Sequence, residues 1–183
     1  MKHSRLLVSS IVGLLLIMTG CYNSEANHHS EDVFNVSFIS SVPTNISEDI
    51  EEYIADFLSN DLPEGTRVRV NMFLPSHDRL TIEMIDRQAD VVIVDEGLEQ
   101  LMLDPYYLVP LDKYEERVLE DVTPYMTIDD RIDEQHLYLV PLRSQSPFIQ
   151  ALGYRLPYDL IIGVVESSPH QELGHKLVDQ WLE

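Results

Sequence analysis

The chain has 183 residues, with 12 lysines and arginines against 32 aspartates and glutamates, so its formal net charge is −20 at pH 7. So acidic a chain repels nucleic-acid phosphates and anionic lipid, and binding to DNA or RNA is therefore excluded. Cys21 is the only cysteine, so we expect no disulfide within the chain, no thiolate metal site and no cysteine nucleophile in the folded domain.

The first 21 residues have the order of features of a secretory signal peptide. Lys2 and Arg5 give a basic start, residues 6–18 are mostly apolar, and small residues follow. The apolar run is shorter than the roughly 20 residues that span a bilayer as a helix. Residues 1–20 are therefore predicted to be a cleaved signal peptide. The alternative is an uncleaved anchor helix with an incidental cysteine.

The four residues Met18, Thr19, Gly20 and Cys21 resemble the cleavage signal of bacterial lipoproteins, with Met18 in place of the usual leucine. The resemblance implies cleavage before Cys21 and attachment of a diacylglyceryl group to its thiol. Two acyl chains suffice for stable anchoring, whereas one chain is marginal. We therefore expect a lipoprotein on the outer face of the cytoplasmic membrane. The acidic mature chain and the short leader favour a Gram-positive bacterium.

Cleavage would remove two basic residues and no acidic one, so the mature chain would carry 10 basic and 32 acidic residues, a net charge of −22. Residues 21–32 are polar and lack apolar periodicity, so they are predicted to form a flexible tether. Residues 33–183 suit a single domain with a core of ordinary size. The acidity is typical of a chain kept soluble near a surface, and a basic partner or a cation is the alternative.

Strand and helix patterns alternate in the first half of the domain. The patterns predict strands at 33–39, 67–73 and 89–94, and helices at 47–58, 78–87 and 98–103. The third strand is apolar throughout, which is typical of a central parallel strand buried on both faces. This order predicts a right-handed parallel β-α-β-α-β unit.

The second half of the domain is less regular. The patterns predict strands at 137–142 and 160–165, an extended piece at 107–111, helical turns at 113–119 and 147–152, and an acidic loop at 123–134. Ser168, Pro169 and Gln171 form a helix-start pattern, so Ser168 is predicted to cap the last helix. The fold class predicted from all elements is α/β, a three-layer sandwich with a mostly parallel sheet.

This order of elements resembles that of bacterial extracellular solute-binding lipoproteins with the type 2 periplasmic-binding-protein fold. The segments that carry the resemblance are 88–95 (QADVVIVD), 108–112 (LVPLD), 136–141 (HLYLVP) and 163–173. The resemblance implies one lobe of that fold and a binding role without catalysis. Family members usually have two full lobes around a cleft, and the chain after residue 112 is too short for a complete second lobe. Binding in half a cleft, pairing with itself or with another protein, and loss of ligand binding therefore stay open.

Ligands collect beyond the carboxyl ends of the strands in an open α/β sheet. The residues that follow the first three predicted strands are Ser40 and Ser41, Ser76 and His77, and Asp95 and Glu96. The serine hydroxyls and the N–H groups at helix starts suit an anionic or zwitterionic solute, whereas the two acids suit an amine or a cation. The alternative is that the serines only end strands and cap helices, with Asp95 a turn residue.

Other motifs predict neither a catalytic nor a metal site. His170 and His175 are five apart, whereas a metal-binding pair on one helix face needs a spacing of three or four. The sequence has no Gly-x-Ser-x-Gly motif and no glycine-rich phosphate loop, and the acids around Arg131 lack the calcium-loop pattern. We therefore expect no enzymatic activity, metal or cofactor.

Two functions from different classes remain. In the first, the domain binds a small-molecule solute in a polar pocket near Ser40, Ser76 and Asp95. In the second, it is a protein–protein interaction module of the cell envelope with a flat apolar or tyrosine-rich patch. Tyrosines are common at binding surfaces and also in ordinary partly buried positions, and the second half is rich in them: Tyr106, Tyr107, Tyr114, Tyr125, Tyr138, Tyr154 and Tyr158.

Overall fold

The computed structural model describes residues 32–118, 121–143 and 145–182. The predicted signal peptide, Cys21 and almost all of the predicted tether lie outside the described residues. Within the described part, none of the helices combines the length and the apolar character needed to cross a membrane.

A five-stranded sheet forms the centre of the fold. Its strands are β1 (Val33–Ile39), β2 (Arg67–Phe73), β3 (Val91–Asp95), β6 (Val140–Leu142) and β7 (Leu160–Val164), in the order β2-β1-β3-β7-β6. Strand β1 is parallel to β2 and β3, and β7 is antiparallel to both of its neighbours. Four of the five strands therefore share one direction, which confirms the mostly parallel sheet.

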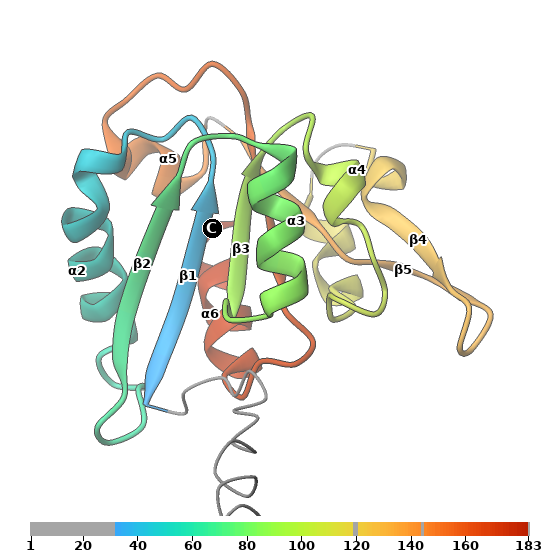
Figure 1. Ribbon diagram of the computed structural model, residues 1–183, viewed down its shortest axis with the longest axis horizontal. Helices are drawn as coiled ribbons and strands as arrows, with labels where there is room; N and C mark the ends of the chain where they lie inside the picture. Colours follow the sequence, from blue (N-terminus) through green and yellow to red (C-terminus); the bar gives the residue numbers. More distant parts are fainter. Residues whose placement is uncertain (1–31, 119–120, 144, 183) are drawn as a thin grey trace, which may run out of the picture.

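Helices lie on both faces of this sheet. The longer ones are α2 (Ser47–Leu58), α3 (His77–Asp86) and α6 (Gln171–Trp181), and the short ones are α4 (Glu99–Met102) and α5 (Pro147–Leu152). Figure 1 shows α3 in front of the sheet and α6 behind it. All five residues of β3 are buried, as its apolar sequence predicts for a strand covered on both sides. The arrangement is compatible with a three-layer α/β sandwich.

Close packing of α6 on the sheet depends on one small residue. A Cβ atom added at Gly174 would lie 2.9 Å from a methyl carbon of Val164 and 3.1 Å from one of Val91. The helix backbone therefore rests directly on β3 and β7 at this point. The apolar side chains on one face of this helix are buried, and they are Leu173, Leu177, Val178 and Trp181.

The acidic segment 123–134, predicted to be a loop, is instead mostly regular structure. A 3-10 helix, η3 (Thr123–Tyr125), leads into an antiparallel pair of strands, β4 (Met126–Asp129) and β5 (Glu134–Leu137). The turn between them is closed by backbone N–H groups of Ile132 and Asp133 that donate to the carbonyl of Asp129. Acidic residues fill the turn and mask the strand alternation on either side of it, so the loop prediction was wrong.

Several further boundaries differ from the prediction, most of them by one or two residues. The strand predicted over 137–142 is divided, because Leu137 ends β5 and β6 begins only at Val140. The last helix begins at Gln171 and is not capped by Ser168. The Ser168 hydroxyl instead donates to the Asp90 carboxylate at 2.5 Å and accepts the His170 N–H at 2.9 Å, so it closes a turn before the helix.

Candidate functional site

The structure brings two of the predicted site residues together at the carboxyl edge of the sheet. The Ser41 N–H donates to both carboxylate oxygens of Asp95 at 2.9 Å, and the Ser41 hydroxyl lies 3.2 Å from one of them. Asp95 is only 3% exposed. Burial raises the pKa of Asp95, and the hydrogen bonds from Ser41 oppose this change. The carboxylate therefore ties the end of β3 to the end of β1.

The other predicted serines also have structural partners. Ser40 is buried, and its hydroxyl accepts the Val42 N–H at 3.3 Å while its own N–H donates to the Phe73 carbonyl. The Ser76 hydroxyl accepts the Arg79 N–H and caps α3. These contacts match the alternative in which the serines end strands and cap helices.

His77 and Glu96 lie at the same edge but do not join the Ser41–Asp95 pair. The His77 carbonyl accepts the Thr81 hydroxyl within α3, and the Glu96 N–H donates to the Asp159 carbonyl. Among the described residues, no hydrogen bond connects either of them to Ser41 or Asp95. Among these six predicted residues, hydrogen bonds within the described part of the chain thus join only Ser41 and Asp95 to each other.

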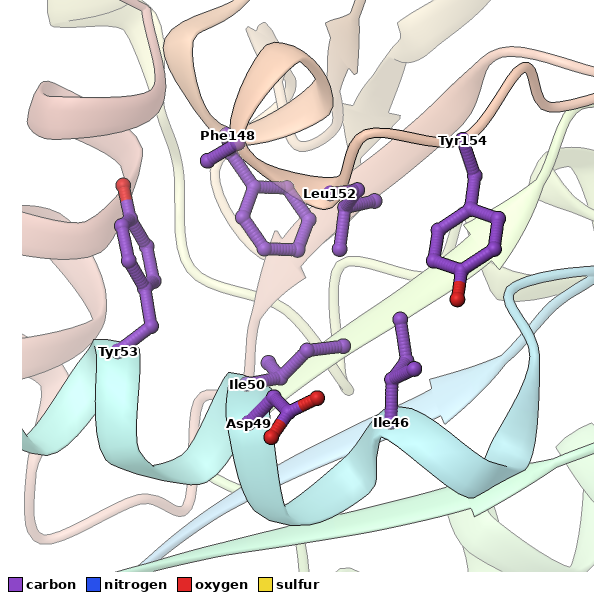
Figure 2. A pocket seen from close by; sticks show the side chains of 8 residues that line it. Ile46, Asp49, Ile50, Tyr53, Phe148, Leu152 and Tyr154 are labelled. Carbon is purple, nitrogen blue, oxygen red and sulfur yellow. The ribbon is translucent and has the colours of Figure 1, made fainter.

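An open cavity of about 260 Å³ lies at this same edge, between α2 and α5. We call it the α5 groove. Figure 2 shows the α2 side chains of Ile50 and Tyr53 facing Phe148 and Leu152 from α5 across it. The complete lining comprises Ile46, Asp49, Ile50, Tyr53, Phe148, Ala151, Leu152 and Tyr154. The groove lies here because α2 follows β1, and α5 follows β6, at the edge where ligands collect in open α/β sheets.

A stacked pair of aromatic rings holds α5 in place. The rings of Phe148 and Trp181 are 4.0 Å apart at an interplanar angle of 16°. Phe38 and Tyr53 each place a ring 6.0 Å from Phe148. The Ser146 hydroxyl also donates to the Trp181 carbonyl at 2.6 Å, just before α5 begins. The groove floor therefore rests on the core, although α5 itself is short.

A second open cavity, of about 490 Å³, lies on the other side of α5. It shares Tyr154 with the α5 groove and is otherwise lined by Leu142, Ile149, Gln150, Gly153, Arg155, Leu156, Tyr158 and Asp159. One guanidinium nitrogen of Arg143 lies 2.6 Å from the Asp159 carboxylate. This ion pair makes one end of the second cavity more polar than the α5 groove.

The α5 groove was not predicted from the sequence, although one of its features, the exposed tyrosines, was visible there. Tyr154 and Tyr158 are exposed beside these cavities, whereas Tyr107, Tyr114 and Tyr138 are buried in the core. The tyrosine-rich second half thus contains both exposed tyrosines, of the kind found at binding surfaces, and tyrosines buried in the core. The sequence alone did not tell them apart, because the distinction depends on which side chains α5 brings against α2.

A second candidate surface lies on the other side of the molecule, and we call it the α3–hairpin face. Its exposed apolar residues are Ile82 and Ile85 on α3, Leu101 on α4, Tyr106, and Ile128 and Ile132 on the β4–β5 hairpin. The Arg87 side chain donates to the Tyr106 carbonyl, and the Arg131 guanidinium lies over the Tyr106 ring. These contacts join α3 to the hairpin, which projects from the sheet in Figure 1.

The hairpin turn is expected to weaken in acid. Hydrogen bonds from Arg131 lower the pKa of Asp129 to about 2, below its ordinary value of 3.8. A depressed folded-state pKa stabilises the fold above pH ~4, and this stabilisation is lost as the pH falls through about 2. We expect Asp129→Asn to lower the free energy of unfolding at pH 7, with the difference from wild type shrinking between pH 4 and pH 2. Urea unfolding at each pH measures this, with Asp130→Asn as the control for removing an exposed acid from the same turn.

The described residues contain no group of three or more His, Cys, Asp and Glu side chains that could hold a metal ion. Comparison of the chain with protein-family models, with curated proteins and with solved structures finds no match.

Proposed function

We propose that this chain is a membrane-anchored extracytoplasmic lipoprotein that binds a small solute without transforming it. The lipid anchor is the diacylglyceryl group expected on Cys21. The domain corresponds to a reduced, single-lobe version of the type 2 periplasmic-binding-protein fold, and the ligand lies in the α5 groove. The observation that carries the proposal is this groove at the carboxyl edge of the sheet, lined by aromatic and aliphatic side chains with a few polar groups.

The hydrogen bonds of the predicted polar residues also support binding without catalysis. Ser41, Ser76 and Asp95 use their side chains to join strand ends or to cap a helix. The α5 groove instead offers apolar contacts, two tyrosine rings and one carboxylate. Such a lining suits the holding of a ligand, because it places no nucleophile beside a general base.

A ligand screen tests the proposal on the full-length chain in phosphatidylcholine vesicles. The panel contains sugars, amino acids, peptides, phosphate, polyamines and small aromatic amines, and thermal unfolding is followed through the single tryptophan, Trp181. A ligand at about 100 times its dissociation constant adds roughly 2.7 kcal/mol, which raises the midpoint by about 5–10 °C for a chain of this size. A cooperative transition with no shift across the panel would contradict solute binding.

Filling the groove should remove the effect of any ligand found in this way. Ala151 is exposed on α5 and lines the α5 groove, so Ala151→Phe should block the groove without disturbing the core. Gln150→Phe is the matched control, because Gln150 is also exposed and directly precedes Ala151 but lines the second cavity instead. We expect the thermal shift to disappear in Ala151→Phe and to persist in Gln150→Phe. The opposite result would place the ligand in the second cavity.

The α3–hairpin face favours a second candidate function, the envelope protein–protein interaction module. Ile85 is 69% exposed on α3 and Ile132 is 57% exposed on the hairpin. Large exposed apolar patches mark interaction surfaces, whereas single exposed apolar residues are common on any protein. This candidate requires no small molecule, so a panel without any thermal shift would favour it over solute binding.

A further inference from the structure

The lining of the α5 groove separates into an apolar floor and a charged rim. Ile46, Ile50 and Phe148 are buried and form the floor. Asp49 is exposed on the first turn of α2, and Figure 2 shows its carboxylate beside Ile50 at the groove. No lysine, arginine or histidine lines the groove, and Arg155 belongs to the second cavity. The groove therefore has negative charge at its rim and no compensating cation in its lining.

Asp49 is available to a ligand. Within the part of the chain that the structure describes, no lysine, arginine or histidine forms an ion pair with it. The helix dipole explains why an acid is favoured in the first turn, and Glu48 fulfils the same role one residue earlier. Glu48 does not line the groove, so the two acids differ in their surroundings although they share a helix turn.

Two tyrosine rings also line the α5 groove. Tyr53 lies at one end of the groove and Tyr154 at the other, as Figure 2 shows. Burial raises the pKa of Tyr53, so its hydroxyl stays neutral at physiological pH. Aromatic faces attract cations, and they also pack against apolar groups. A carboxylate, two such rings and an apolar floor are together complementary to a molecule with a positive charge at one end.

We propose that the ligand of the α5 groove is a small organic cation with an apolar body, an aromatic or alkyl amine, whose ammonium group lies beside Asp49. This inference rests on the proposed function and names the class of its solute. The size of the groove agrees with it. A protein cavity of about 150 Å³ holds a benzene molecule. A groove of about 260 Å³ thus has room for one ring and a short chain.

Three probes with similar apolar bodies and different charges test the inference: 2-phenylethylamine, 2-phenylethanol and 3-phenylpropionate. Each is titrated into the full-length chain in phosphatidylcholine vesicles while Trp181 fluorescence is recorded, because Trp181 stacks on the Phe148 ring of the groove floor. We expect saturable binding of the amine, with a half-saturating concentration about five- to tenfold lower than that of the alcohol. The carboxylate should need a higher concentration than the alcohol.

A pair of charge-matched variants separates the local carboxylate from the acidity of the whole chain. Asp49→Asn and Glu48→Gln each remove one negative charge from the first turn of α2. We expect Asp49→Asn to lose the preference for the amine over the alcohol and Glu48→Gln to keep it. Equal loss in both variants would overturn the role of Asp49, since long-range attraction would then explain the preference.

The outcomes distinguish the ligand class from the site. Saturable binding of all three probes without preference, abolished by Ala151→Phe, would overturn the cationic ligand and leave the proposed function in place. Absence of saturable binding by any of the three probes would overturn the ligand class, and the wider panel would still decide solute binding. Amine binding that survives Ala151→Phe would contradict both the ligand class and the groove.

Discussion

Replacing Phe148 with alanine is expected to lower the free energy of unfolding by about 3–5 kcal/mol, the usual cost of truncating a buried aromatic side chain. Phe148 is almost fully buried although it lies on a helix of only six residues. Its ring stacks on Trp181 and contacts the rings of Phe38 and Tyr53. The variant therefore loses core packing and the floor of the α5 groove at once, so ligand binding should be lost as well.

Urea unfolding followed by circular dichroism measures the effect, because removal of Phe148 changes the surroundings of Trp181 and complicates fluorescence. Tyr154→Ala is the matched control, since Tyr154 lines the same groove but is 47% exposed. We expect the control to change the free energy of unfolding by less than about 0.5 kcal/mol. A loss below about 1 kcal/mol in Phe148→Ala would mean that α5 is not packed on the core as described.

Asp90→Ala should be the second strongly destabilising substitution, with an expected loss of about 2–5 kcal/mol. Asp90 is fully buried and directly precedes β3. Its carboxylate accepts the Asn35 N–H at 2.6 Å and the Ser168 hydroxyl at 2.5 Å. Alanine leaves both donors without this partner inside the fold, and an unsatisfied buried polar group costs about 1–3 kcal/mol.

Asp90→Asn provides the informative comparison. Asparagine keeps the volume and one acceptor oxygen, so it should recover part of the lost stability. Asp130→Ala removes an exposed acid from the hairpin turn and should change the free energy of unfolding by less than about 0.5 kcal/mol. If Asp90→Ala and Asp130→Ala had equal effects in urea unfolding, Asp90 would not be the link between β1, β3 and the turn before α6.

The sequence predicted most of the fold because the first half of the domain follows local rules. Strands β1 and β2 and helix α2 begin and end where their apolar periodicity predicts. The antiparallel direction of β7 was not predictable in the same way, because its apolar sequence suits either direction. The hairpin was missed because its turn is closed by backbone contacts to Asp129, in a segment where acidic residues hide the alternation.

The candidate site was predicted only in its position at the edge of the sheet. Ser41 and Asp95 do lie there together, but they form hydrogen bonds with each other. The presence of a polar residue at a strand end therefore did not reveal whether its side chain is available to a ligand. The α5 groove depends on a contact between Phe148 and Trp181, which are far apart in the sequence. Such a contact leaves no local pattern, and the groove therefore emerged only from the packing of α2, α5 and α6.

Hydrogen–deuterium exchange can show whether a bound solute lies in the α5 groove. The full-length chain in phosphatidylcholine vesicles is compared with and without the panel ligand that gives the largest thermal shift. We predict slower exchange in residues 46–54 and 147–154, the two segments that enclose the groove. Two results would contradict solute binding in the α5 groove. One is protection confined to residues 82–87 and 126–137 on the α3–hairpin face, and the other is protection confined to the ends of β1 and β3 at Ser41 and Asp95.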